Sequence, residues 1–390
     1  MHNFDEIINR RGTDSLKWDS IKNIYKQDDL LPMWVADMDF KIAPEIAEAV
    51  TNRANHMTYG YTIPGKIYYD SIIKWNIKRN NYEIKKEWIK VSSGVIPSLK
   101  AAIFGFTEKE DKILIQTPVY PPFYNSIKSA KRQLITNPLK LDGEKYIIDF
   151  DDFEEKIKSG VKLFILSNPH NPVGRVWTFE ELKKIVDICY KYNVKILSDE
   201  IHSDIIYKGY KHCVLNTVSE NAKNISIVCA SPSKTFNIAG LCSSYVIVEN
   251  EVIRKQMWES MSNIGVEMIN LFGITAGETA YNYCETWADE MVAYIEKNAE
   301  FVCEYMKEKL PEVKTYKPEA TYLMWLDFRE YKLSQTELMQ KLVNEAKVVL
   351  NSGTEFGEEG YGFVRLNIGC PKSMIKTCID RIADVFNYKN

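Results

Sequence analysis

The sequence predicts an α/β protein, with a mainly parallel sheet in a large domain and a smaller α+β domain beside it. Three observations support this prediction. The chain has 390 residues, which is too long for one compact core and favours two domains. Residues 161–197 follow a strand–helix–strand pattern. Beyond Glu249 the pattern changes to long helices with two further strand-like runs.

The strand–helix–strand pattern has clear start signals. The runs Val161–Leu166 and Val194–Leu197 are apolar and indicate buried strands. Between them, Thr178 and Glu181 have the spacing of a capping box, and an apolar stripe follows at helical spacing. A unit of this kind joins parallel strands by a right-handed crossover, so a parallel sheet is expected.

Earlier and later segments add elements of the same kind. A helix is expected after Pro44, because proline is favoured in the first turn of a helix. The other expected elements are the strand Trp88–Val91, the turn Ser92–Gly94, the helix Ile96–Phe104, the strand Lys112–Gln116 and the buried strand Asn224–Cys229.

Gly60, Gly65 and Lys66 have the spacing of a nucleotide-binding loop, but we reject that interpretation. Ile67 occupies the position where such a loop needs Ser or Thr to hold Mg²⁺. A helix rather than a strand is also expected before this loop. The tyrosines of the segment are instead expected to reach across to a neighbouring site.

The C-terminal part is predicted to form the smaller domain. Its expected elements are the helices 252–264 and 273–310, the strand 322–327, a helix near 335–346 and a final strand 363–368. We place the large domain at residues 46–285 and the small domain at 286–390. The N-terminal segment 1–45 is expected to pack with the small domain.

Composition excludes several classes of function. The chain is 45% hydrophobic and 26% charged, which is ordinary for a soluble globular protein. Its net charge is −3 and its basic residues are dispersed, so neither a nucleic-acid nor a membrane surface is expected. The first residues lack a secretory signal. Eight cysteines without a Cys-x-x-Cys pair and five scattered histidines favour free thiols in a reducing cytoplasm and no metal site.

Three polar side chains follow three strands of the predicted sheet. Asn171 lies in the loop after the first strand of the 161–197 unit, Asp199 follows the second, and Lys234 follows the strand that ends near Cys229. Because the carboxyl ends of parallel strands share one edge, these residues are expected to converge on one crevice. Each alone is explained by a turn, a cap or a solvated lysine. Their convergence favours a functional site.

Other residues add groups that suit a flat, phosphorylated cofactor. Gly94 precedes a helix start, whose free N–H groups bind phosphate, and Ser231 and Ser233 can donate to the same group. Tyr120 precedes two prolines and can stack on a ring. With a lysine amine and a carboxylate, this set suits pyridoxal 5'-phosphate. Arg365 lies in an apolar strand, so either an acidic residue pairs with it or it holds a substrate carboxylate.

At these residues the sequence resembles the class I/II aminotransferase-fold enzymes that depend on pyridoxal 5'-phosphate. The matching motifs are Asn168-Pro-His-Asn171-Pro-Val-Gly174, Ser198-Asp199-Glu200, Ser231-Pro-Ser-Lys234 and Phe363-Val-Arg365. The resemblance spans most of the chain and implies the fold type I of these transferases. Within the superfamily the chain looks most like the cystathionine β-lyase branch, because of the segments Arg11–Trp18, Trp34–Phe40, Tyr59–Tyr61 and Ser233–Leu241.

The resemblance implies roles for individual residues. The three catalytic residues would be Lys234 as the Schiff-base lysine and general base, Asp199 at the pyridine nitrogen and Tyr120 over the ring. Asn171 would bond the ring hydroxyl. The phosphate would be bound by Gly94, Val95, Ile96, Ser231 and Ser233, and by Tyr61 of a partner subunit. A homodimer is therefore expected. The substrate contacts would come from Arg365, Asn171 and Ala36.

Two positions depart from the pattern of many aminotransferases. Cys242 stands where they carry an arginine for the phosphate, and His202, which we include in the cofactor site, stands where they often place a tyrosine. Both departures resemble the lyase branch. The expected activity is α,β-elimination of cystathionine- or cysteine-type substrates to a thiol, pyruvate and ammonia. An aminotransferase of amino acids, or a cofactor-binding regulatory protein that acts through partner contacts, stays an alternative.

Overall fold

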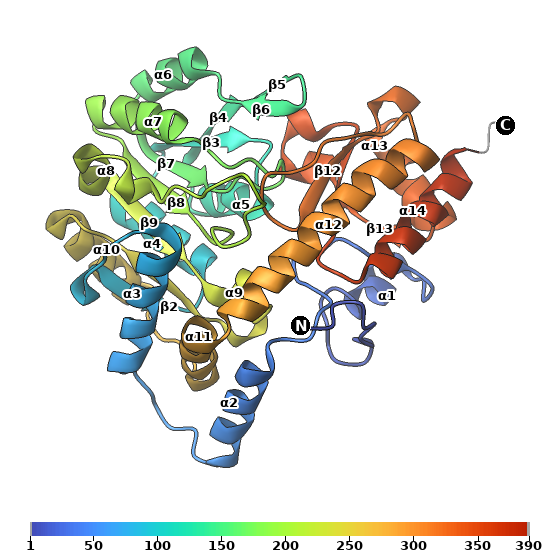
Figure 1. Cartoon of the computed structure of the whole chain (residues 1–390). Coiled ribbons are helices and arrows are strands. Elements are labelled where there is room, and N and C mark those ends of the chain that lie inside the picture. The colour runs from blue at the N-terminus through green and yellow to red at the C-terminus, as the bar shows by residue number, and fades with distance from the viewer. Residues whose placement is uncertain (1, 388–390) are drawn as a thin grey trace.

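A computed structural model describes residues 2–387, and a seven-stranded sheet lies at its centre (Figure 1). The strand order is β2-β10-β9-β8-β7-β3-β4. The five strands from β9 to β4 run parallel, whereas β10 is antiparallel to both of its neighbours. The prediction of a mainly parallel sheet is confirmed. The strands are β2 Ile89–Ser92, β3 Lys112–Thr117, β4 Gln133–Pro138, β7 Val161–Ser167, β8 Lys195–Asp199, β9 Ser226–Ala230 and β10 Ser244–Ile247.

Helices cover both faces of this sheet, because its strands are apolar on both sides. In β3, Ile113 and Ile115 join an apolar cluster with Leu99 of α4 and Met257 of α10, whereas Leu114 joins a separate cluster. The helices of this region are α2 Pro44–Asn55, α3 Lys66–Asn80, α4 Val95–Phe106, α5 Pro121–Ser129, α6 Phe150–Lys158, α7 Phe179–Lys191, α8 Glu220–Ile225, α9 Pro232–Thr235, α10 Glu251–Asn263 and α11 Leu271–Tyr283.

The predicted strand–helix–strand unit is present and positions the candidate site. Thr178 and Glu181 form the capping box at the start of α7. The helix returns the chain to β8, which pairs parallel with β7 so that Ser167 lies opposite Asp199. The ends of β7 and β8 therefore lie side by side, and the next strand, β9, ends beside them.

A second, four-stranded sheet lies in the C-terminal part, in the order β11-β12-β15-β14 (Figure 1). Its strands pair antiparallel. The N-terminal β1 pairs with β13 of this part, while the division into domains at residues 45 and 285 stays a prediction. The elements are α1 Ser20–Tyr25, β1 Leu31–Pro32, α12 Glu285–Lys309, β11 Lys314–Thr315, β12 Leu323–Asp327, α13 Gln335–Gln340, β13 Val348–Val349, β14 Asn351–Ser352, β15 Phe363–Asn367 and α14 Lys372–Phe386, and the hairpin β5 Lys140–Asp142 and β6 Lys145–Ile147 belongs to neither sheet.

Two helix predictions are wrong in detail. The single helix expected over 273–310 is two helices, α11 and α12, because Cys284 leaves the helical conformation at φ −107° and ψ 22°. The helix expected near 335–346 is α-helical only to Gln340 and continues to Glu345 as a π turn. The sequence contains no Gly or Pro at either break to signal it.

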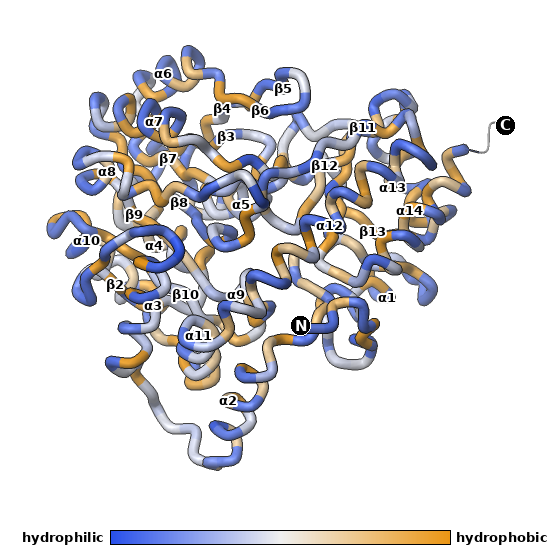
Figure 2. The backbone as a smooth tube through the Cα atoms, viewed as in Figure 1, coloured by the Kyte–Doolittle hydropathy of each residue, from blue (hydrophilic) through white to orange (hydrophobic). Residues whose placement is uncertain are grey.

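The segment between α2 and α3 projects from the rest of the molecule (Figure 1). Its exposed large hydrophobic side chains are Met57, Tyr59, Tyr61 and Ile63. By contrast, Figure 2 shows hydrophobic residues along the strands inside the main sheet. Within residues 2–387, no helix combines the length and apolar character needed to cross a membrane.

Candidate active site

A cavity of about 190 Å³ lies at the carboxyl ends of β7, β8 and β9. Most of the predicted site residues line it, and they come from six separate segments of the chain. They are Ala36, Gly94, Val95, Ile96, Tyr120, Asn171, Asp199, His202, Ser231, Ser233 and Lys234. The structure brings these residues together as the strand order requires. Their roles in binding and catalysis stay predictions.

Lys234 lies on the one-turn helix α9, directly after β9. Its amine donates a hydrogen bond to the backbone oxygen of Ala36, 2.6 Å away. Burial lowers the pKa of Lys234 to about 8, although Asp37 and Asp199 raise it in part. A substantial share of this amine is therefore neutral near pH 8, as a nucleophile or a general base requires.

Asp199 is the last residue of β8, and its side chain is buried at the cavity wall. Among the described residues, only the backbone N–H of Ile201 donates to its carboxylate, at 3.1 Å. Burial therefore raises the pKa of Asp199 to about 7. A cationic N–H opposite this carboxyl would stabilise its charged form and lower that pKa.

The helix α4 presents its N-terminus to the same cavity. Gly94 is the cap residue, and no side chain within residues 2–387 caps the helix. The backbone N–H groups of Val95 and Ile96 and the positive end of the helix dipole therefore suit a phosphate. The hydroxyls of Ser231 and Ser233 lie 2.7 Å apart nearby, and Ser231 caps α9.

Two rings flank the cavity. Tyr120 is the cap residue of α5, and its ring lies 6.1 Å from that of Phe123. His202 is buried, and its ring lies 5.8 Å from that of Tyr322. Burial, together with Lys234, lowers the pKa of His202 to about 3, so the imidazole is neutral. A neutral ring beside Lys234 adds no positive charge to the site.

Arg365 is buried on β15, and its hydrogen-bond partners are all neutral oxygens. It donates to the side-chain oxygens of Asn171 at 3.1 Å and Asn351 at 2.7 Å, and to the backbone oxygen of Trp34 at 3.1 Å. Its Nε atom has no partner among residues 2–387. Burial lowers the pKa of Arg365 to about 10. Of the two interpretations of this arginine, a guanidinium ready for an external carboxylate is therefore favoured.

Two predicted site residues, Arg365 and Tyr61, are not among the residues that line the cavity. Arg365 contacts Asn171, which lines it, whereas among the described residues no such contact ties the cavity to Tyr61. Its side chain is 100% exposed on the segment that projects between α2 and α3. A residue in this position has no contact with the cavity of its own chain. A role for Tyr61 in the site of a partner subunit stays a prediction.

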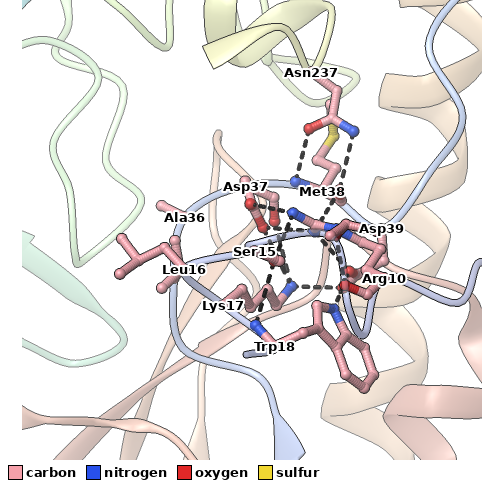
Figure 3. A network of polar contacts seen from close by, with 12 residues as sticks. Arg10, Ser15, Leu16, Lys17, Trp18, Ala36, Asp37, Met38, Asp39 and Asn237 are labelled. Atoms are coloured by element: carbon pink, nitrogen blue, oxygen red, sulfur yellow. Dashed lines mark hydrogen bonds and ion pairs between the residues drawn. The ribbon is translucent and has the colours of Figure 1, made fainter. Parts of the chain in front are cut away.

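Sequence reasoning missed the residues that support the site from behind. Tyr322 donates a hydrogen bond to the backbone oxygen of Ala36 at 2.9 Å, and Asn351 holds Arg365. Figure 3 shows a network of charged residues around segment 36–39, with Arg10 and Lys17 on one side and Asn237 on the other. The available signal was the density of charged residues in the N-terminal segments Arg11–Trp18 and Trp34–Phe40. That pattern does not indicate which residues pair.

The donors in the cavity fit pyridoxal 5'-phosphate. No described residue accepts a hydrogen bond from the amide nitrogen of Asn171, which leaves a donor for a ring oxygen. Asp199 has an oxygen without a donor among the described residues, and the α4 N-terminus offers free N–H groups. The amine of Lys234 completes a set that matches the aldehyde, nitrogen, hydroxyl and phosphate of this cofactor.

Comparisons with known proteins agree with this arrangement. The family described as "Aminotransferase class I and II" matches residues 33–382. The chain is 42% identical, over 97% of its length and 98% of the other, to a protein of Bacillus subtilis (strain 168) named "Cystathionine beta-lyase PatB". A pyridoxal-phosphate-bound "putative aminotransferase" structure from Clostridium difficile 630 is 47% identical, with a TM-score of 0.96, covering 99% of this chain and 100% of that one. The structure of cystalysin from Treponema denticola, which contains pyridoxal 5'-phosphate, is 34% identical with a TM-score of 0.96, covering 99% of both chains.

Proposed function

The chain belongs to the class I and II aminotransferase family, and on that premise we propose that it is a carbon–sulfur β-lyase dependent on pyridoxal 5'-phosphate. It cleaves cystathionine- or cysteine-type substrates by α,β-elimination, and yields a thiol, pyruvate and ammonia. The observation that carries this proposal is the meeting of a partly neutral lysine amine, a buried carboxyl and a phosphate-binding helix end in one cavity. The lyase names of relatives that match nearly the whole chain support the choice of reaction.

Each part of the cofactor has a residue that would hold it. Lys234 would bind its aldehyde, Asp199 its ring nitrogen and Asn171 its ring oxygen, while the start of α4 and Ser233 would bind its phosphate. When bound, the cofactor supplies an electron sink for the charge that is left at the substrate α-carbon. His202 and Tyr120 line the same cavity.

The protein's own groups divide the work of binding and proton transfer. Arg365 binds the substrate carboxylate, because a buried guanidinium without an acidic partner gains most from an external anion. Lys234 takes the α-proton as general base, which its lowered pKa of about 8 permits near neutral pH. Asp199, once ionised, holds a proton at the ring nitrogen.

The working unit is a homodimer in the cytoplasm. The exposed apolar side chains of the projecting segment support this, because such a patch usually marks an interaction surface. Tyr61 lies on this segment and would reach the phosphate site of the partner subunit. The partner of the site is a small-molecule amino-acid substrate, and neither nucleic acid nor a membrane is a partner.

The test is a reaction with cystathionine and no added keto acid. The purified protein, loaded with cofactor, is expected to release pyruvate, ammonia and homocysteine in equal amounts. Lys234→Ala is the matched control and should reduce the rate by about 10²–10⁴-fold, the range for loss of a general base. A protein that releases no pyruvate, but transfers the amino group once a keto acid is added, is an aminotransferase and contradicts the proposal. The similarity to a structure titled "putative aminotransferase" makes this second activity the one to exclude.

A further inference from the structure

Residues 36–39 have no regular secondary structure, and other segments hold them from two sides (Figure 3). The first of them, Ala36, lines the cavity. On one side, Arg10 donates to both carboxylate oxygens of Asp37 at 3.0 and 2.7 Å, and to Asp39 at 2.8 Å. On the other side, Asn237 accepts from the backbone N–H of Met38 at 3.0 Å and donates to its backbone oxygen at 2.9 Å. The backbone of the segment is therefore fixed in both directions.

A buried ion pair lies at the end of this segment. Lys17 is fully buried and donates to Asp39 at 2.6 Å, and Trp18 donates to the other oxygen of Asp39 at 2.8 Å. Burial opposes ionisation of Asp39, but Lys17, Trp18 and Arg10 together outweigh it, and the pKa of Asp39 is lowered. A buried pair of charges is costly to form and is poor evidence of stabilisation on its own. Its position at the end of a segment whose first residue, Ala36, lines the cavity is therefore the more informative feature.

The segment begins at Ala36, and its backbone oxygen accepts two hydrogen bonds. One comes from the amine of Lys234 at 2.6 Å and the other from the hydroxyl of Tyr322 at 2.9 Å. Thr321, the residue before Tyr322, lies at φ 73°, which is strained for a β-branched residue and needs surrounding contacts to hold it. Tyr207 donates to the backbone oxygen of Thr321 at 2.8 Å and holds it there.

We propose that Arg10, Asp37, Asp39, Lys17 and Asn237 are positioning residues that hold the backbone oxygen of Ala36 against the amine of Lys234. Tyr322 shares that oxygen and limits how strongly it binds the amine. The inference deepens the proposed function, since it rests on Lys234 as the reactive amine. In this inference the N-terminal segment controls the protonation of the Lys234 amine. Arg10 and Lys17 act on the amine only through residues 36–39.

The charged and titratable groups around the amine come from four segments of the chain. They are Asp37, Asp199, His202, Tyr322 and Arg365. Ala36 and Asp37 both stabilise the protonated amine, one as an acceptor and the other as a negative charge. If the segment loosens, both withdraw, the protonated form loses support and the pKa of Lys234 falls. If instead Tyr322 loses its hydroxyl, the oxygen of Ala36 serves the amine alone and this pKa rises.

The deciding variant is Arg10→Lys, which keeps the charge but loses the paired hydrogen bonds to Asp37. Arg11→Lys is the matched control, because Arg11 contacts Leu30 and Trp18 but not residues 36–39. Protein stripped of cofactor is mixed with pyridoxal 5'-phosphate at a series of pH values, and the rate of attachment to Lys234 is followed by borohydride trapping. The neutral amine reacts, so the midpoint of the rate against pH reports its pKa.

We expect the midpoint of Arg10→Lys to fall by on the order of 0.5 pH unit, and that of Arg11→Lys to stay within error of the parent. Tyr322→Phe should move the midpoint upward, and this variant decides the matter if Arg10→Lys does not fold. An unchanged midpoint in the folded variants, with only a lower unfolding temperature in Arg10→Lys, would overturn the proposal and leave a structural network. If the parent protein attaches cofactor normally but releases no pyruvate from cystathionine, only the proposed function is contradicted, and the positioning role is not.

Discussion

The guanidinium of Arg365 donates a hydrogen bond to the side-chain oxygen of Asn171 at 3.1 Å. The two residues are 194 positions apart and belong to different parts of the fold, β15 and the loop after β7. The bond ties the residue expected to bind the substrate carboxylate to the one expected to bind the cofactor ring. With these two roles, substrate binding and ring orientation would be coupled through one contact.

Arg365→Lys should weaken substrate binding more than it slows turnover. A lysine keeps the charge but cannot form the paired hydrogen bonds that a guanidinium makes with a carboxylate. We expect KM for cystathionine to rise by about 10–100-fold, the loss of one hydrogen bond to a charged group, with a smaller change in kcat. Steady-state kinetics of pyruvate release measure both. A fall in kcat at unchanged KM would contradict a role in carboxylate binding.

Asp199→Asn should change how the stability of the cofactor-free protein depends on pH. The pKa of Asp199 is about 7 in the folded chain, because of burial, and about 4 in an unfolded chain. Between these values the folded state binds more protons than the unfolded state, so stability falls as pH rises from about 4 to about 7. Asparagine removes this loss, and the variant should be more stable than the parent at pH 8 by about 1–4 kcal/mol.

Urea unfolding of the stripped proteins at pH 5 and pH 8 checks this expectation. Asp187→Asn is the control, because Asp187 is exposed on α7 and its ion pair with Lys183 contributes little to stability. The difference between Asp199→Asn and the parent should shrink at pH 5. An equal difference at both pH values would mean that the buried carboxyl does not carry the raised pKa.

The features of the fold and site that depend on local sequence patterns or on strand order could be predicted from the sequence. The capping box of Thr178 and Glu181 located α7, and the parallel strand order placed Asn171, Asp199 and Lys234 on one edge. These inferences succeed because each depends on neighbours in sequence or on a general rule of sheet topology. The family resemblance added the identity of the cofactor and the individual roles.

Contacts between distant segments could not be predicted in this way. The pairs Arg10–Asp37 and Arg365–Asn351 join residues that no helix or strand repeat relates. The local sequence therefore does not indicate which side chains meet. The break at Cys284 also lacks a signal, since the flanking residues favour a helix and tertiary packing decides where the chain turns. The pair Arg10–Asp37 is also the contact on which the proposed positioning of the Lys234 amine depends.

Gly174→Ala should destabilise the protein and disturb the Asn171 loop. Gly174 has φ +70°, and a Cβ atom there would lie 2.4 Å from the side chain of Pro318. The backbone N–H groups of Glu319 and Ala320 donate hydrogen bonds to the backbone oxygen of Gly174. These bonds join the loop to the 318–320 segment, so neither can move away freely. We expect a loss of about 1–3 kcal/mol from the clash in addition to the backbone strain.

Gly160→Ala separates the two effects, because Gly160 has φ +98° but no atom within 4 Å of the added Cβ. It carries the strain without the clash. Urea unfolding midpoints of the two variants measure the difference. Equal losses would show that the contact with Pro318 is relieved at no cost, and that the loop after β7 is less constrained than its hydrogen bonds indicate.

Ile63→Glu should weaken the expected homodimer. Ile63 is 88% exposed beside Tyr61, on the segment that projects between α2 and α3. A carboxylate buried against an apolar partner surface lacks a compensating charge, so the dissociation constant of the dimer should rise by about 10-fold or more.

Because Tyr61 is expected to complete the partner's phosphate site, cofactor retention should fall together with dimerisation. Sedimentation velocity and the absorbance of bound cofactor after gel filtration measure the two effects. Ile24→Glu, at an exposed position of α1, is the control and should change neither. A dimer that survives Ile63→Glu, with its cofactor fully retained, would place the subunit interface elsewhere and leave Tyr61 without a role in the site.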